Sequence, residues 1–290
     1  MRYAFAILLA SHGLIHLMGF VKALYATDMS KQVLGISKPI GSVWLIVFLL
    51  FLIASSAFLS QKKWFYIAFV AVFISQVLII MTWKEAKYGT IPNMIILLVA
   101  ISSFSTERFN KKVEIESQLV LQNMGSNKEA LVSESDLVNL PQIIQKWMTK
   151  SGVIGKEKVK TMQLKQVGEM RTKPNAKWMP FKAVQYFNIE NPAFIWKTEV
   201  EMIPLVSLLG RDKLFDGEGE ILITLAGVVP VVNESKNYKI DSGSMLRFLA
   251  EICWSPSAAL NDYISWERVD DISAKATFIQ KGTSVSGVFF

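Results

Sequence analysis

The chain has 290 residues, of which 51% are hydrophobic and only 19% charged, and its net charge at neutral pH is +7. The excess positive charge lies in residues 1–112, which carry 11 basic and 3 acidic side chains, whereas the remainder carries 20 basic and 21 acidic ones. Nucleic-acid binding would require clustered Lys and Arg on the soluble part, and that part is neutral, so no nucleic-acid partner is expected.

Residues 1–105 are predicted to form a bundle of four transmembrane helices, because a hydrocarbon core of about 30 Å requires ~20 apolar helical residues. The first stretch is too long for the apolar region of a signal peptide and is followed by three more spans, so it is retained as a helix. The third is bounded by Trp64 and Trp83, as is typical of membrane interfaces. The predicted spans are residues 3–25, 41–60, 64–83 and 91–104.

Four spans place both ends of the bundle on one side of the membrane. Basic residues near the spans favour the side that carries the termini by six to five, which indicates that this side is cytoplasmic. We therefore expect a multi-pass protein of the cell membrane with its soluble domain in the cytoplasm. Membrane lipids are its expected partners, and the identity of any protein partner is unknown. The counted residues are Arg2, Lys62, Lys63, Arg108, Lys111 and Lys112 against Lys22, Lys31, Lys38, Lys84 and Lys87.

The only two histidines, His12 and His16, lie in the first predicted span. Their spacing places both on one helix face, which is expected to pack against other helices because ionisable groups avoid lipid. Three roles remain open: hydrogen bonds that fix the packing, metal binding or a proton relay, and haem ligation. Two imidazoles on one helix turn cannot occupy opposite axial positions of one iron, and a metal would need further ligands. His12 and His16 are thus candidate metal ligands, and the cofactor is unknown.

Residues 106–134 are polar and predict either a juxtamembrane helix or a tether. A β-rich soluble domain is expected over residues 135–290. It begins with an amphipathic helix from Ser135 to Gly152, since apolar residues recur there at steps of three and four. The chain reaches Phe290 within a predicted strand, so we expect that further strands followed.

After this helix the apolar period changes to two, which is typical of strands. Turns are expected at Asp216-Gly217 and Lys281-Gly282, and consecutive strands separated by turns indicate an antiparallel sheet. One helix interrupts the strands, with a predicted apolar stripe that includes Leu246 and the only cysteine, Cys253. The expected strands are residues 158–171, 181–187, 194–202, 211–216, 219–225, 266–270, 274–280 and 284–290.

Several kinds of catalysis are not expected of the soluble domain. It contains no histidine, so Ser-His and Cys-His catalysis are excluded, and it has no glycine-rich phosphate loop and no zinc-binding cluster. Its acidic groups could serve glycoside hydrolysis, but acidic turns and outward strand faces explain them as well. The aromatic residues on the strands could form a core or line a cavity for an apolar ligand.

The phrases LPQIIQKWMTKSGVIG, WMPFKAVQYF, PAFIW, LLGRDKLFDGEG and LRFLAEICWSP resemble an uncharacterised family of bacterial membrane proteins. That resemblance implies no activity, and it implies recurring polar positions at Arg211, Asp212, Asp216 and Glu251, with Trp254 beside them. PAFIWKTEV followed by FDGEG is similar to the LolA-like lipoprotein carriers, which implies a curved antiparallel sheet that wraps a helix and encloses acyl chains. The four-helix part resembles DoxX-type membrane modules.

The sequence therefore predicts a transmembrane α-helical bundle joined to an α+β domain in which a curved antiparallel sheet packs on a helix. The leading hypothesis is a membrane-tethered half-barrel that binds a lipid or another apolar ligand. The alternative is a redox or metal module centred on His12 and His16. A third reading is a structural or sensory protein in which Arg211 and Glu251 form an ion pair. The candidate ligand-binding residues are Phe187, Phe194, Trp196, Arg211, Asp212, Asp216, Glu251 and Trp254.

Overall fold

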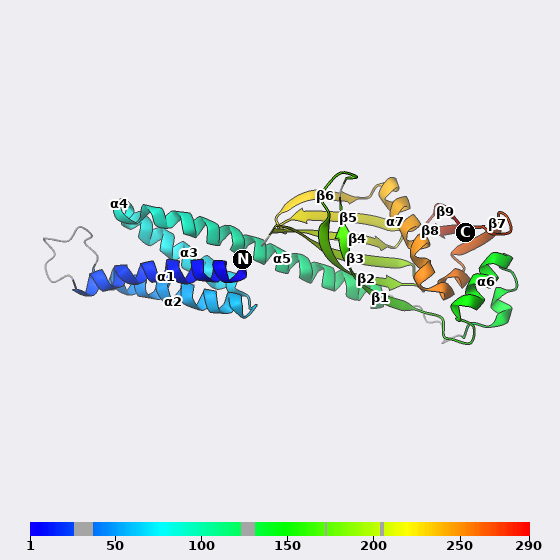
Figure 1. The fold of residues 1–290 in the computed structure, drawn as a ribbon, viewed down its shortest axis with the longest axis horizontal. Coiled ribbons are helices and arrows are strands. Elements are labelled where there is room, and N and C mark those ends of the chain that lie inside the picture. The colour runs from blue at the N-terminus through cyan, green and yellow to red at the C-terminus, as the bar shows by residue number, and fades with distance from the viewer. Residues whose placement is uncertain (26–36, 123–130, 172, 204–205) are drawn as a thin grey trace. The chain divides into compact units, whose positions relative to one another are not determined.

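The computed structural model describes residues 1–25, 37–122, 131–171, 173–203 and 206–290. The chain divides into two compact units, Met1–Glu107 and Arg108–Phe290. The division falls inside one long helix, so the two halves of that helix belong to different units (Figure 1). Lys31, which was counted in predicting the orientation, lies outside the described residues, as do residues 123–130 of the predicted linker.

Within the described residues, four helices are long and apolar enough to cross a membrane, as predicted. They are α1 (Arg2–Tyr25), α2 (Lys38–Leu59), α3 (Trp64–Met81) and α5 (Thr90–Gln122), with the short α4 (Trp83–Ala86) and the 3-10 helix η2 (Lys87–Gly89) between the last two. The predicted fourth span was much shorter than α5, whose 33 residues extend for about 50 Å. Residues 106–134 were expected to form either a juxtamembrane helix or a tether. The helix is correct up to Gln122.

Small residues allow the first two helices to approach closely. A Cβ atom on Gly19 would lie 2.4 Å from the Trp44 ring, and one on Gly41 would lie 2.3 Å from Cβ of Ala23. Close approach at glycine and alanine is the usual way in which helices associate in lipid. Large apolar side chains such as Phe73 and Leu98 remain more than 60% exposed, which suits contact with hydrocarbon.

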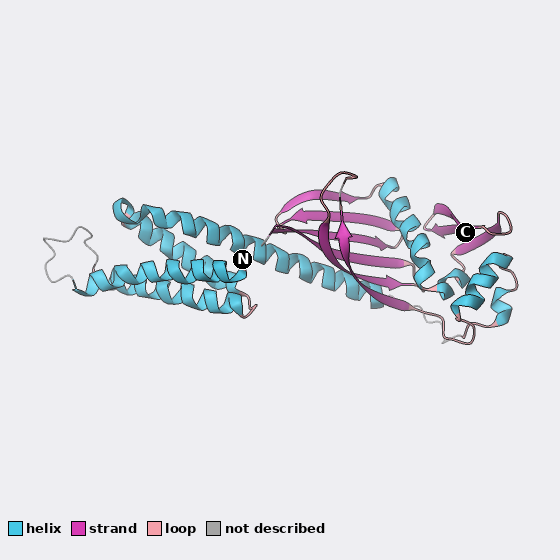
Figure 2. Cartoon of the chain, viewed as in Figure 1, coloured by secondary structure: helices cyan, strands magenta, loops and turns pink. Residues whose placement is uncertain are grey.

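The described part of the second unit contains two antiparallel sheets and two α-helices besides the second half of α5, which confirms the predicted α+β class (Figure 2). The first sheet has six strands in sequence order, and the second has three. The strands are β1 (Thr161–Met170), β2 (Met179–Asn188), β3 (Ala193–Ile203), β4 (Val206–Phe215), β5 (Glu218–Leu225), β6 (Val229–Ser235), β7 (Ile264–Arg268), β8 (Ala274–Gln280) and β9 (Thr283–Phe289).

Both predicted two-residue turns are confirmed. Asp216-Gly217 has φ values of 53° and 83°, and Lys281-Gly282 has 48° and 80°, the left-handed pair that tight hairpins require. A third such turn, at Ala226-Gly227, leads into β6, a strand that the sequence analysis missed. Strand β6 contains Pro230 and lies at the edge of its sheet, where a missing backbone N–H is tolerated.

The helix predicted to begin at Ser135 is in fact divided. Residues Glu134–Leu137 form the 3-10 helix η3, and α6 spans Gln142–Ser151. Pro141 causes the division, because a proline disfavours the helical conformation of the residue before it. The predicted stop at Gly152 is confirmed, since this residue has φ of 67°.

The predicted apolar stripe on α7 (Tyr238–Glu251) is partly wrong. Met245, Phe248 and Leu249 are buried, whereas Leu246 is 44% exposed. Cys253, expected to be buried, is exposed. The α-helix ends at Glu251 and is followed by the tighter 3-10 helix η4 (Ile252–Trp254), so the period of 3.6 residues does not continue to Cys253.

The two faces of the six-stranded sheet are covered by different helices. On one face, Phe187, Phe194 and Leu214 pack with Met245 and Phe248 of α7. On the opposite face, the second half of α5 buries an apolar strip against the strands. This second contact joins Phe109, Val113 and Val120 to Ala193, Ile195 and Leu209.

A buried ion cluster accompanies the contact between α5 and the sheet. The Arg211 side chain is 3% exposed, and its guanidinium donates to both carboxylate oxygens of Glu116 at 2.8 and 2.9 Å and to Glu220 at 2.6 Å. Lys213 adds a contact of 2.9 Å to Glu220. Burial alone would raise the pKa of Glu220, but the bonds from Lys213 and Arg211 lower it overall. The hypothesis that Arg211 pairs with Glu251 is therefore wrong.

We predict that Arg211→Met destabilises the second unit by about 1.5–3 kcal/mol, because it removes charged hydrogen bonds from two partly buried carboxylates. The measurement is denaturant unfolding of the full chain in detergent, followed by tryptophan fluorescence. Arg268→Met is the matched control, since Arg268 forms an exposed pair with Asp271 and should change stability by less than about 1 kcal/mol. Equal losses in the two variants would contradict a structural role for the buried cluster.

Candidate functional site

The two histidines lie inside the helix bundle, as their spacing predicted. His12 and His16 are 2% and 1% exposed. Their rings contact aromatic side chains of α2: the His12 ring lies 4.9 Å from Phe51, and the His16 ring lies 5.1 Å from Trp44, between centroids. The imidazoles are thus enclosed by helices and shielded from lipid.

Hydrogen bonds connect the two imidazoles in a closed circuit. His12 Nε2 donates to Oδ1 of Asn93 at 2.8 Å, and Nδ2 of Asn93 donates to Oγ of Ser75 at 2.9 Å. The Ser75 hydroxyl donates to His16 Nε2 at 2.8 Å, and His16 Nδ1 donates to the backbone oxygen of His12 at 2.9 Å. With one proton on each ring, every bond of the circuit has one donor and one acceptor, so both histidines are assigned as neutral.

One ring nitrogen is left over. His12 Nδ1 is buried and has no hydrogen-bond partner among the described residues, and the same holds for Nε1 of Trp44. In the tautomer that the circuit requires, His12 Nδ1 is an acceptor, whereas the indole N–H is a donor. An unsatisfied buried polar atom costs about 1–3 kcal/mol of stability. A ligand that bonds to His12 Nδ1 and Trp44 Nε1 could remove this cost.

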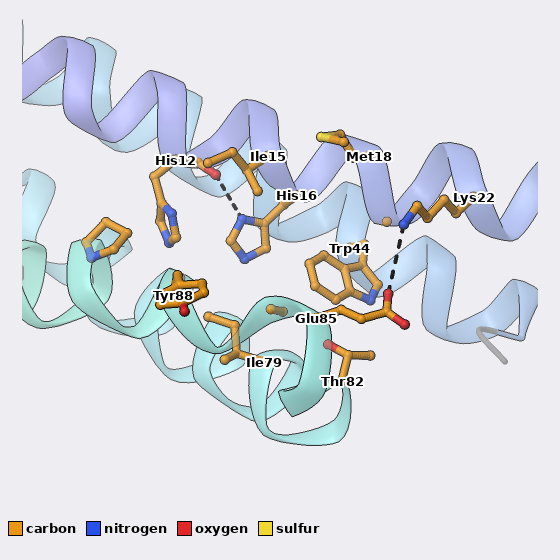
Figure 3. A pocket seen from close by; sticks show the side chains of 14 residues that line it. His12, Ile15, His16, Met18, Lys22, Trp44, Ile79, Thr82, Glu85 and Tyr88 are labelled. Carbon is orange, nitrogen blue, oxygen red and sulfur yellow. Dashed lines mark hydrogen bonds and ion pairs between the residues drawn. The ribbon is translucent and has the colours of Figure 1, made fainter. Parts of the chain in front are cut away.

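His12 and Trp44 both line a cavity of about 420 Å³ in the bundle. Figure 3 shows His12 and His16 pointing from α1 toward Ile79 of α3 and Tyr88 of η2. Small-molecule sites commonly measure about 300–1,000 Å³, so the cavity has an appropriate size. The other lining residues are Ile15, Met18, Gly19, Lys22, Thr82, Glu85, Ala86, Gly89 and Pro92.

The charged residues of this cavity are already paired. Lys22 Nζ lies 4.0 Å from a carboxylate oxygen of Glu85, with side-chain exposures of 57% and 28%. Their exposure marks the solvent-accessible end of the cavity, whereas His12 marks its buried end. The cavity therefore combines an apolar wall, the neutral polar side chains of His12 and Trp44, and the ion pair of Lys22 and Glu85.

The donor set offers little to a metal. Three of the four ring nitrogens of His12 and His16 are engaged in the circuit, and no group of three or more His, Cys, Asp or Glu that could hold a metal occurs among the described residues. A metal bound by both Nε2 atoms would have to displace Asn93 and Ser75. The arrangement fits hydrogen bonding better than coordination.

A second polar cluster lies on the α7 face of the sheet and brings together four predicted ligand-binding residues. Its centre is Arg247 of α7, which the sequence analysis did not name. The Arg247 guanidinium donates to Asp212 at 2.7 Å and to Glu251 at 2.9 Å. It also lies 5.0 Å from the ring centroids of both Phe194 and Trp196.

The two carboxylates of this cluster differ in their surroundings. Burial raises the pKa of Asp212, although the Arg247 guanidinium opposes the shift. Glu251 accepts a further hydrogen bond of 2.7 Å from the buried amide of Gln185. One guanidinium thus serves two carboxylates.

The remaining predicted residues do not join this cluster. Phe187 is 1% exposed and packs against Phe248 in the core under α7. Arg211 points to the opposite face of the sheet because it precedes Asp212 on the same strand. Asp216 lies in an exposed turn, 3.1 Å from Lys281, and Trp254 is 45% exposed.

Sequence reasoning missed the partners of the predicted residues. Ser75 and Asn93 are uncharged polar residues within apolar spans, and this position alone was a signal that they face other helices. Arg247 precedes Glu251 by four residues on one helix, a spacing that brings such side chains together. No local pattern pointed to the free indole N–H of Trp44.

Fold and site together define a helix bundle of membrane-spanning length with a buried histidine circuit, followed by an α+β unit built on a six-stranded antiparallel sheet. A model for a family of unknown function (DUF6544) matches residues 130–290, which is more than half of the chain. The chain belongs to this family, and the expected membership of an uncharacterised family is confirmed. No curated protein and no solved structure matches the chain.

We predict that the stability of the Asp212→Asn variant, relative to that of the natural chain, increases as the pH rises from about 4 to 7. The raised pKa means that folding penalises the carboxylate; the penalty is absent below the unfolded pKa of about 3.9 and grows above it. The measurement is the melting temperature of the second unit in the full chain across this pH range.

Asp270→Asn is the control for this experiment and should show the opposite trend. Hydrogen bonds from Ser273 and from the backbone of Ile272 lower the pKa of Asp270, so its carboxylate stabilises the fold above the unfolded pKa. A parallel pH trend in the two variants would refute the distinction between the two carboxylates.

Proposed function

We propose that this chain is a membrane protein that binds a lipid or another apolar small molecule in the bundle cavity beside His12 and Trp44. One observation carries the proposal: His12 Nδ1 is a buried hydrogen-bond acceptor without a partner in the described chain, and its ring lines a cavity of about 420 Å³. Such an atom is satisfied when a bound molecule offers a hydrogen-bond donor.

The two free atoms indicate the chemistry of the ligand. His12 Nδ1 would accept from a hydroxyl or an amide N–H, and Trp44 Nε1 would donate to a carbonyl or ether oxygen. The surrounding side chains are largely apolar, and the ion pair of Lys22 and Glu85 has no net charge. A charged group would lose its hydration there without compensation, so the ligand is a neutral amphiphile.

The cavity is a better candidate than the interior of a half-barrel. The aromatic residues that motivated the half-barrel hypothesis include Phe187 and Phe194, which are 1% and 0% exposed. They pack against Met245 and Phe248 of α7. A ligand in their place would have to displace core side chains, at a cost of several kcal/mol.

We predict that His12→Gln weakens binding of the proposed bundle ligand by about tenfold, equivalent to one neutral hydrogen bond. The glutamine amide can still donate to Asn93 in place of His12 Nε2, but it has no acceptor at the position of Nδ1. The measurement is native mass spectrometry of the full chain, followed by extraction and identification of the bound compound.

His16→Gln is the matched control: His16 also lines the cavity, but the glutamine oxygen can still accept from Ser75, and His12 Nδ1 is left unchanged. This variant should keep the ligand. Equal ligand content in the two variants would refute the assigned role of His12. A stoichiometric metal lost only when both histidines are replaced would instead support the redox or metal alternative.

We also propose that the second unit faces the cytoplasm, as the distribution of basic residues favours. Cys253 is the only cysteine and is exposed, so it is a natural reporter of sidedness. Partial desolvation of the thiol and the nearby Glu251 raise the pKa of Cys253, so labelling is best done at mildly alkaline pH.

With this arrangement, a membrane-impermeant maleimide should not label Cys253 in intact cells and should label it after permeabilisation. Cys253→Ser shows the background, because it leaves no thiol. Labelling in intact cells at the rate seen after permeabilisation would establish the opposite orientation.

A further inference from the structure

A second cavity, of about 640 Å³, lies in the second unit beside α6. Apolar side chains form its walls: Ile143 and Trp147 from α6, and Phe289 from the end of β9. Phe289 is held by an edge-to-face contact with Trp266, with 5.3 Å between ring centroids. This cavity is independent of the bundle cavity and belongs to a different part of the chain.

The polar edge of this cavity is cationic. Lys146 and Lys150 are the residues with charged side chains in its lining, and both are exposed. Neither has an ion-pair partner within the described residues. They are four residues apart on α6, as are Ile143 and Trp147, so a cationic strip runs alongside an apolar strip.

We propose that this cavity binds a single-chain amphiphile with an anionic head group, of the long-chain fatty-acid type. The alkyl chain would pack against Ile143, Trp147 and Phe289, where burial of each methylene contributes to affinity. The carboxylate would lie between the ammonium groups of Lys146 and Lys150. The charge of the edge selects an anion, whereas the bundle cavity suits a neutral molecule.

Cys253 lines the same cavity and therefore reports its occupancy locally. The test uses the full chain in nanodiscs of zwitterionic phosphatidylcholine, with oleate or oleyl alcohol added at equal concentration. Oleate should slow maleimide labelling of Cys253 at least fivefold, and oleyl alcohol should have little effect. Because the reporter is local, ligand bound in the helix bundle does not affect the result.

The double variant Lys146→Gln/Lys150→Gln should bind oleate about tenfold more weakly, as expected for the loss of two exposed ion pairs. Lys281→Gln, which removes an exposed lysine that does not line this cavity, should retain full protection. Tryptophan fluorescence checks that each variant is folded. Equal protection by oleyl alcohol, unchanged oleate affinity in the double variant, or no protection by saturating oleate would each overturn the proposal.

Discussion

Both units depend on one constraint: a polar group removed from water must find its partner inside the protein. In the bundle, His12 and His16 meet this constraint through Asn93 and Ser75, which come from two other helices. In the second unit, Arg211 meets it through Glu116 of α5 and Glu220 of the neighbouring strand. The partners are distant in sequence, so these groups can be satisfied only once the helices and strands have assembled. Each cluster therefore favours one arrangement of its elements over alternatives with similar apolar burial.

Because buried polar groups normally have partners inside the protein, a buried atom without one can indicate a ligand site. Nε of Arg211 also lacks a partner within the described structure, but that guanidinium already makes three hydrogen bonds to carboxylates. His12 and Trp44 differ in kind. Nδ1 is the only acceptor of the His12 ring in its assigned tautomer, and Nε1 is the only donor of Trp44. Both residues line the same cavity, and we propose that a single molecule bonds to both atoms. That combination motivates a ligand, whereas an isolated orphan atom does not.

Local sequence patterns predicted the features that depend only on residues close together in the sequence, namely the spans and the turns. Apolar length predicted the four helices, and glycine at a left-handed position predicted the turns at Gly217 and Gly282. What failed depends on tertiary context. Cys253 follows an apolar stripe, but a change from α to 3-10 geometry turns it outward. Arg211 and Asp212 are adjacent in sequence, yet strand alternation sends them to opposite faces, where different helices supply their partners. No single-sequence pattern states which helix covers which face, so neither Glu116 nor Arg247 could be assigned in advance.

The two cavities impose opposite electrostatic requirements on molecules with similar hydrocarbon parts. At the bundle cavity, the buried end is neutral and the charged end is compensated, so an anion would lose hydration without gaining a cation. At the α6 cavity, two lysines without ion-pair partners among the described residues lie beside an apolar wall. A neutral head group would form no ion pair with them. A long-chain acid in its neutral form offers one donor and one acceptor, which matches His12 Nδ1 and Trp44 Nε1, whereas its anion matches Lys146 and Lys150. Charge state, and not chain length, is therefore the property by which the two sites would distinguish their ligands.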